Sequence, residues 1–99
     1  MYIIVTNKPG EYSSEPGDGV RAIESWKYLF YGQERAIFTI SEVTDTTARI
    51  RIVDAEDPSC VNSVPNKFFG DFEDVEAARA EIEELIKFGD LDARLERVA

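Results

Sequence analysis

The segment from Asp71 to Gly89 constrains the fold of this chain most, because it has the pattern of an amphipathic helix. Good helix formers fill the segment, and its apolar residues recur at the three- and four-residue spacing that gathers side chains into one stripe. These residues are Val75, Ala78, Ile82, Leu85 and Ile86. Asp74 is a suitable N-cap, and Gly89 suits the position after the last turn. The pattern predicts a helix over about residues 75–88 whose stripe, Leu85 included, packs on a sheet.

The face opposite this stripe is acidic. At about 100° per residue, the side chains on that face are Glu73, Glu76, Ala80, Glu83, Glu84 and Lys87. Residues 71–92 hold nine acidic and two basic residues, a net charge of −7, whereas residues 1–70 carry −3 and the whole chain −9. The excess charge therefore belongs to the helix and its flanks, and a basic partner would be steered there.

The rest of the chain has the pattern of strands. A β-branched run, YIIVT at residues 2–6, predicts a buried strand inside a sheet. The segments 26–31, 36–43 and 48–54 alternate or are rich in β-branched residues, and their short connections predict an antiparallel meander. Residues 20–25 are interpreted as a helical turn or irregular lead-in. Residues 94–98 fit a last strand or a loose tail.

These elements predict an α+β fold of one 99-residue domain. Its sheet has four to five antiparallel strands, formed by the meander Trp26–Asp54 and the N-terminal strand, with the single long helix across one face. Residues 7–19 and 55–70 are expected to be loops. The first is rich in Gly and Pro and is long enough to be functional.

Several chemical classes are excluded by composition. The chain has no histidine, which rules out histidine triads, Cys–His dyads and histidine metal sites. Its single Cys60 forms no intrachain disulfide and builds no zinc site. The net negative charge disfavours direct binding to nucleic acid or to anionic membranes. No apolar run approaches the roughly 20 residues of a membrane span, and the N-terminal run is too short for a signal peptide. A cytoplasmic protein is expected.

Two weak motifs are better explained by structure. Gly17, Gly19 and Ala22 spell G-x-G-x-x-A, but the motif does not directly follow a strand, as dinucleotide binding requires. The pattern D-x-E-D occurs at residues 54–57 and 71–74, and carboxylates are ligands for calcium or magnesium. The spacing matches no calcium loop, and a turn and a helix N-terminus account for it. The sequence therefore predicts no catalytic residue, no cofactor and no metal site.

Aromatic residues crowd the segment from Trp26 to Tyr31. Core packing is the commoner fate of such a cluster, although Leu29 and Tyr31 could face solvent or a partner, because the helix covers only one face of the sheet. The residues predicted to contact a protein partner are Glu73, Glu76, Glu83, Glu84 and Tyr31.

The sequence favours a small acidic, non-enzymatic protein-interaction module, an accessory subunit or regulator of a larger assembly. Its partner would be a protein with a basic surface, and homo-oligomers are possible. One alternative is an acidic inhibitor of phage type that mimics nucleic acid and blocks a basic groove. Another is a small-ligand-binding or carboxylate-based enzyme domain that uses the 7–19 loop.

Overall fold

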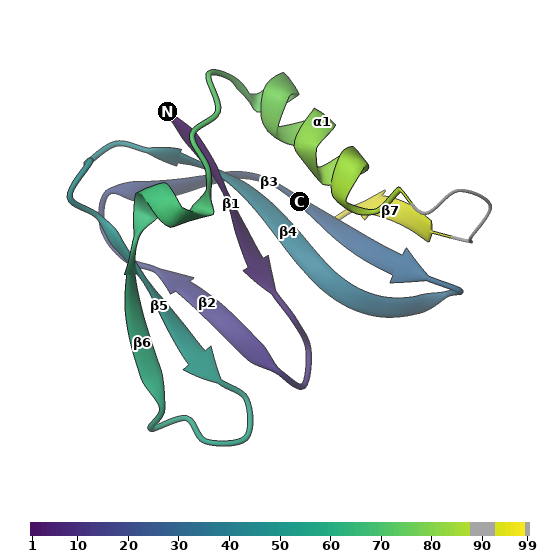
Figure 1. Ribbon diagram of the computed structural model, residues 1–99, viewed down its shortest axis with the longest axis horizontal. Helices are drawn as coiled ribbons and strands as arrows, with labels where there is room; N and C mark the ends of the chain where they lie inside the picture. The colour runs from purple at the N-terminus through teal and green to yellow at the C-terminus, as the bar shows by residue number, and fades with distance from the viewer. Residues whose placement is uncertain (88–92, 99) are drawn as a thin grey trace.

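The computed structural model describes residues 1–87 and 93–98, which form seven strands, a 3-10 helix and one α-helix (Figure 1). The strands are β1 (Tyr2–Asn7), β2 (Tyr12–Pro16), β3 (Val20–Phe30), β4 (Gln33–Val43), β5 (Arg49–Asp54), β6 (Val61–Pro65) and β7 (Ala93–Arg97). The helices are η1 (Asn66–Phe69) and α1 (Val75–Leu85). The α+β class is confirmed.

The strands form two antiparallel sheets, so the prediction of a single sheet is wrong. The first sheet has the order β1-β4-β3-β7 and the second has the order β2-β5-β6. Strands β3 and β4 form the expected hairpin, but β5 leaves the meander and pairs with β2 and β6. Alternation in β5 shows only that one of its faces is buried. That face covers the first sheet instead of extending it.

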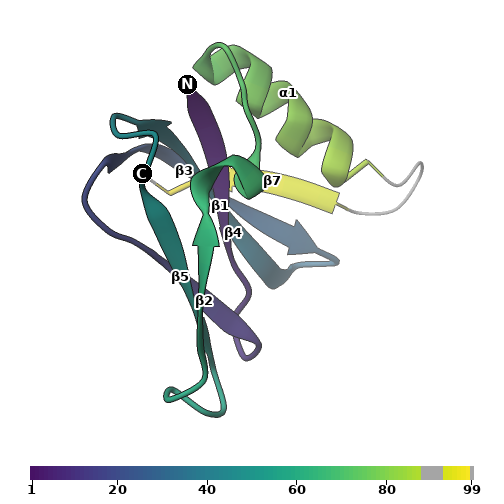
Figure 2. The same ribbon diagram turned by 60° about the vertical axis from the view of Figure 1, so that its left-hand side comes forward.

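The first sheet lies between two covering layers, with α1 on one side and the second sheet on the other (Figure 2). Strand β1 shows why. Ile4 packs with the helix, whereas Ile3 and Val5 pack with Ile50 of the second sheet. Both faces of β1 are therefore apolar, although β1 lies at the edge of its sheet and not inside it as predicted.

Three segments expected to be irregular contain regular structure. The 7–19 segment includes β2, which polar contacts hold in place: the Ser14 backbone N–H donates to Asn7 Oδ1, and its hydroxyl donates to the Thr6 carbonyl. The 55–70 segment includes β6 and η1. Polar strands of this kind lack the hydrophobic alternation that identifies a strand in sequence.

The supposed lead-in at residues 20–25 is the first part of β3. A register shift lies between Ala22 and Glu24, as expected of a β-bulge. As a result, Val20 packs toward the second sheet while Trp26 packs toward α1, although both positions are even-numbered. Because of this change of face, the apolar residues Val20, Ile23 and Trp26 recur every three residues, as they would in a helix. Of the two possibilities left open for residues 94–98, a last strand or a loose tail, the strand is the one that forms, as β7, which pairs with β3.

Helix α1 begins as predicted, because Asp74 Oδ1 accepts a hydrogen bond of 2.8 Å from the Ala77 backbone N–H. The helix ends at Leu85, so the predicted end near residue 88 is wrong: at Ile86 the backbone, with φ −101° and ψ 4°, has left the helical conformation. Phe88 and Gly89, predicted as the last residue and C-cap of the helix, lie outside the described residues. Its buried side chains are Ala78 and Ile82, followed by Ile86 just after the helix. Leu85 is 52% exposed, so its predicted burial is wrong. It lies about 60° around the helix from Ile82, at the margin of the stripe.

Candidate functional site

The outer face of α1 presents a row of exposed acidic side chains. Glu73, Glu76, Glu83 and Glu84 are all exposed, and so is Glu81, which the sequence interpretation did not include. The helix itself, VEAARAEIEEL, holds four glutamates and a single arginine. Whether this face contacts a partner stays a prediction.

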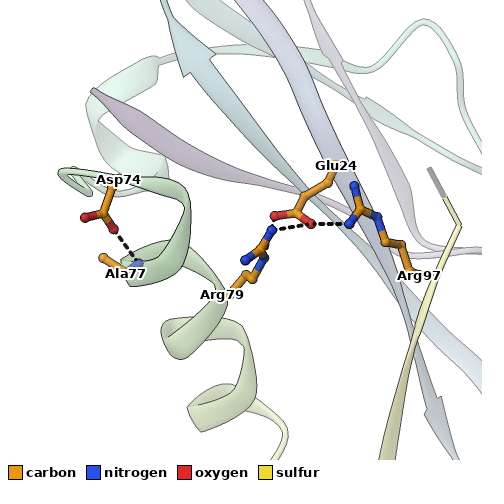
Figure 3. A network of polar contacts seen from close by, with 5 residues as sticks. All are labelled: Glu24, Asp74, Ala77, Arg79 and Arg97. Atoms are coloured by element: carbon orange, nitrogen blue, oxygen red, sulfur yellow. Dashed lines mark hydrogen bonds and ion pairs between the residues drawn. The ribbon is translucent and has the colours of Figure 1, made fainter.

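The single arginine of α1, Arg79, points at the sheet and is bound to Glu24, with a weaker electrostatic attraction to Glu76 of the outer face. Its Nε donates to Glu24 Oε1 at 2.7 Å and its Nη2 donates to Glu24 Oε2 at 3.3 Å (Figure 3). Arg97 of β7 lies 3.5 Å from the same Oε2. The Glu24 side chain is only 1% exposed. Hydrogen bonding to Glu24 raises the pKa of Arg79, so this guanidinium stays charged.

Sequence reasoning missed this ion cluster, in which a buried Glu24 is bound by the partly exposed Arg79 and Arg97. A signal was present, since Glu24, Trp26 and Tyr28 alternate along one face of β3. A carboxylate in register with core aromatics needs a cationic partner. The cluster ties β3, α1 and β7 together, which makes it a structural element.

The face of the first sheet that carries α1 is only partly covered. An 11-residue helix is about 16 Å long, whereas the 11-residue strands β3 and β4 each extend to about 36 Å. Beyond the helix, this face is open. The uncovered part is hollowed, and the hollowed surface continues past the edge strand β1 to η1, Tyr12 of β2 and Ile52 of β5. We call this surface the groove.

The groove consists of two hollows that share Thr6, Tyr12 and Leu85 in their walls. The hollow next to η1 has a volume of about 500 Å³. It is lined by Ile4, Thr6, Tyr12, Ile52, Phe68, Phe69, Gly70, Phe72, Glu81 and Leu85. The hollow next to the β3–β4 hairpin has a volume of about 710 Å³. It is lined by Thr6, Lys8, Glu11, Tyr12, Tyr28, Phe30, Arg35, Ala36, Phe38 and Leu85.

Aromatic side chains make up four of the ten lining residues of each hollow. In the hairpin hollow, Tyr28 stacks on Phe38 with ring centroids 6.3 Å apart and meets Phe30 edge-to-face at 6.4 Å. The Arg35 guanidinium lies 5.9 Å from the centre of the Phe30 ring. Such surfaces supply contact area more than reaction chemistry. The aromatic cluster expected in the core therefore also lines a surface groove.

Tyr31 lies beside this groove, at the tip of the β3–β4 hairpin. It is 58% exposed, and its ring meets that of Phe30 at 4.7 Å. Its backbone φ is +51° and is followed by +78° at Gly32, as in the two-residue turns that match strand twist. Tyr31 is thus placed by the turn and not by strand alternation.

The two D-x-E-D clusters have structural roles in turns and a cap. Asp54 Oδ1 accepts hydrogen bonds from the backbone N–H groups of Glu56 and Asp57, and Asp74 caps α1. Asp57 in turn accepts from the Ser59 hydroxyl, which lowers the pKa of Asp57. Within residues 1–87 and 93–98, no three potential ligand side chains are grouped as a metal site would require.

Comparison of the chain with protein-family models, with curated proteins and with solved structures finds no match. In the described part of the chain, no helix has the length and hydropathy needed to cross a membrane.

Proposed function

We propose that this protein is a small, non-enzymatic interaction module that docks through the outer face of α1 onto a basic surface of a protein partner. Accessory subunits and regulators of larger assemblies work in this way. The observation that carries the proposal is the separation of charge on α1. Its glutamates are exposed, while its single arginine is bound to Glu24.

Electrostatics gives this arrangement a function in association. Exposed like charges on one face raise the rate of encounter with an oppositely charged surface and suppress wrong partners. The same charge disfavours contact with nucleic acid and with anionic membranes. Cytoplasmic residence is part of the proposal, since the chain has one cysteine, Cys60, and this thiol is free and exposed.

The two alternatives receive less support. A ligand-binding or enzyme domain built on residues 7–19 would join that segment to a buried carboxylate. Tyr12 and Glu11 line the groove, but Glu24 lines neither of its hollows. A nucleic-acid mimic needs acids spaced like two phosphate strands, and α1 supplies one row. If the recovered partner binds DNA, competition between DNA and this protein for that partner would identify a mimic.

A pull-down with cross-linking tests the proposal. The bait is the wild-type chain or the variant Glu76→Gln/Glu83→Gln/Glu84→Gln, which keeps helix propensity nearly constant. The control variant, Glu15→Gln/Asp18→Asn/Glu56→Gln, removes the same charge from exposed positions outside α1 and outside the β3–β4 hairpin. The wild type and the control should recover the same partner, and the α1 variant should lose it.

Salt dependence supplies the second measurement. The association rate of the wild type with that partner should fall as salt rises, because exposed charges are screened beyond roughly 8 Å at physiological ionic strength. Equal partner affinity for the wild type and the α1 variant at low salt would refute docking through this face.

A further inference from the structure

We infer that the groove is a binding site for a basic amphipathic helix of a partner protein, whose apolar side chains enter the two hollows while its Lys or Arg side chains lie along α1. The inference rests on the proposed function and adds to it the place and the kind of segment bound.

The first argument is the exposed apolar surface. Phe68 is 72% exposed and Leu85 is 52% exposed, and both line the hollow next to η1. Single exposed apolar residues are normal, but a continuous apolar patch marks an interaction site. Because the two hollows join at Tyr12 and Leu85, the groove suits an extended occupant better than a compact ligand.

The second argument is the charge of the walls. Glu81 lies one turn before Leu85, so both side chains face the groove from α1. Arg79, the basic residue of α1, lines neither hollow. Its guanidinium points to Glu24 (Figure 3). The α1 wall is therefore acidic. At the far end of the groove, the charges of Lys8, Glu11 and Arg35 are mixed in sign. Basic side chains of an occupant are favoured along α1.

The third argument concerns the mode of recognition. The hairpin hollow lies over the face of β3 and β4, where the backbone groups of β4 are already paired with β1 and β3. The hollow next to η1 lies at the edge of β1, where the backbone of Tyr2 is already paired with Phe72. Affinity must then come from side chains, as when an amphipathic helix lays its apolar face into a hydrophobic groove. Apolar anchors at the spacing i, i+3 or i+4, and i+7 would enter both hollows.

A defined peptide tests the inference. The probe is a helical Leu/Lys peptide of about 18 residues with one apolar stripe, long enough to form a helix once bound. Its control is a scrambled peptide of the same composition without a stripe. Calorimetry measures affinity, and amide NMR shifts locate the site. The wild type should bind the amphipathic peptide at least about tenfold more tightly than the scrambled peptide, with shifts in α1, η1, β1 and the β3–β4 hairpin.

Two variants separate groove binding from charge attraction. The groove variant Phe68→Ala/Leu85→Ala removes two exposed anchors and should bind the peptide at least about tenfold more weakly. The control Ile23→Ala removes a 37% exposed side chain that lines neither hollow and should bind like the wild type. Circular dichroism verifies that each variant is folded.

The outcomes distinguish the two proposals. If the groove variant binds the peptide like the wild type, the groove is not the site, while the α1 pull-down still decides the proposed function. Equal affinity for both peptides also overturns the inference, since charge alone then accounts for binding. Self-association of the wild type that the groove variant abolishes would make a second copy of this chain the occupant and refute a basic helix.

Discussion

The packing of α1 predicts that two substitutions one turn apart have very different costs. Ile82 is 1% exposed and Leu85 is 52% exposed, and mutation to alanine removes three carbon atoms from each. At about 0.8 kcal/mol per buried carbon, Ile82→Ala loses roughly 2.4 kcal/mol of transfer free energy. The cavity left behind raises the total to about 3–4 kcal/mol. Leu85→Ala loses about half of the transfer term and leaves no closed cavity, so it costs about 1 kcal/mol.

Urea denaturation followed by far-UV circular dichroism measures both free energies of unfolding, and equal slopes would show that the variants unfold to the same degree. The expected difference is about 2–3 kcal/mol, with Ile82→Ala the more damaging. If Leu85→Ala costs as much as Ile82→Ala, the helix is rotated relative to the sheet. Leu85 would then belong to the core, and the groove would lose the wall that joins its two hollows.

Three further predictions concern polar groups. Arg79→Gln removes two hydrogen bonds to the buried Glu24 carboxylate and should cost about 1–3 kcal/mol by denaturation. Adding Glu24→Gln should recover part of that loss, and a double variant less stable than Arg79→Gln would contradict the ion cluster. Ser41→Ala should stabilise by about 1 kcal/mol, because the buried Ser41 hydroxyl has no hydrogen-bond partner among the described residues; a loss of stability would show that it has one. The hydroxyl and backbone N–H of Thr47 lower the pKa of Asp45 in the folded protein below its ordinary 3.8. The ionised Asp45 therefore stabilises the folded state above pH 3.8, and this contribution is lost as the pH falls through the pKa of Asp45 in the folded protein. NMR titration should show this low midpoint and its rise in Thr47→Ala, and an unchanged midpoint would exclude the hydroxyl as its cause.

The sequence was most informative where one physical rule acts alone. The N-cap at Asp74, the helix and the fold class followed from local spacing and capping chemistry. The division into two sheets could not be predicted in this way. Alternation in β5 reports that one face is buried, but it does not report which sheet covers that face or which strand pairs with it.

The candidate site was less predictable, because it depends on tertiary geometry. The bulge near Ile23 changes which residues of β3 face α1, and this places Glu24 under Arg79. The hairpin hollow arises from the mismatch in length between α1 and the strands, and the hollow next to η1 arises where η1 and the second sheet pack beside β1. No local sequence pattern contains either feature. The acidic residues of α1 could be named from helical spacing alone, whereas the exposure of Leu85 depends on how the helix is rotated on the sheet.

Amide hydrogen exchange of the wild-type chain, measured with and without the partner recovered by the pull-down, tests the docking surface most directly. The account predicts slower exchange in α1, in η1 and in the β3–β4 hairpin around Tyr31, with unchanged exchange in β6, which lines neither hollow. Slower exchange confined to β5 and β6, with α1 and the hairpin unchanged, would contradict it and place the docking surface on the second sheet.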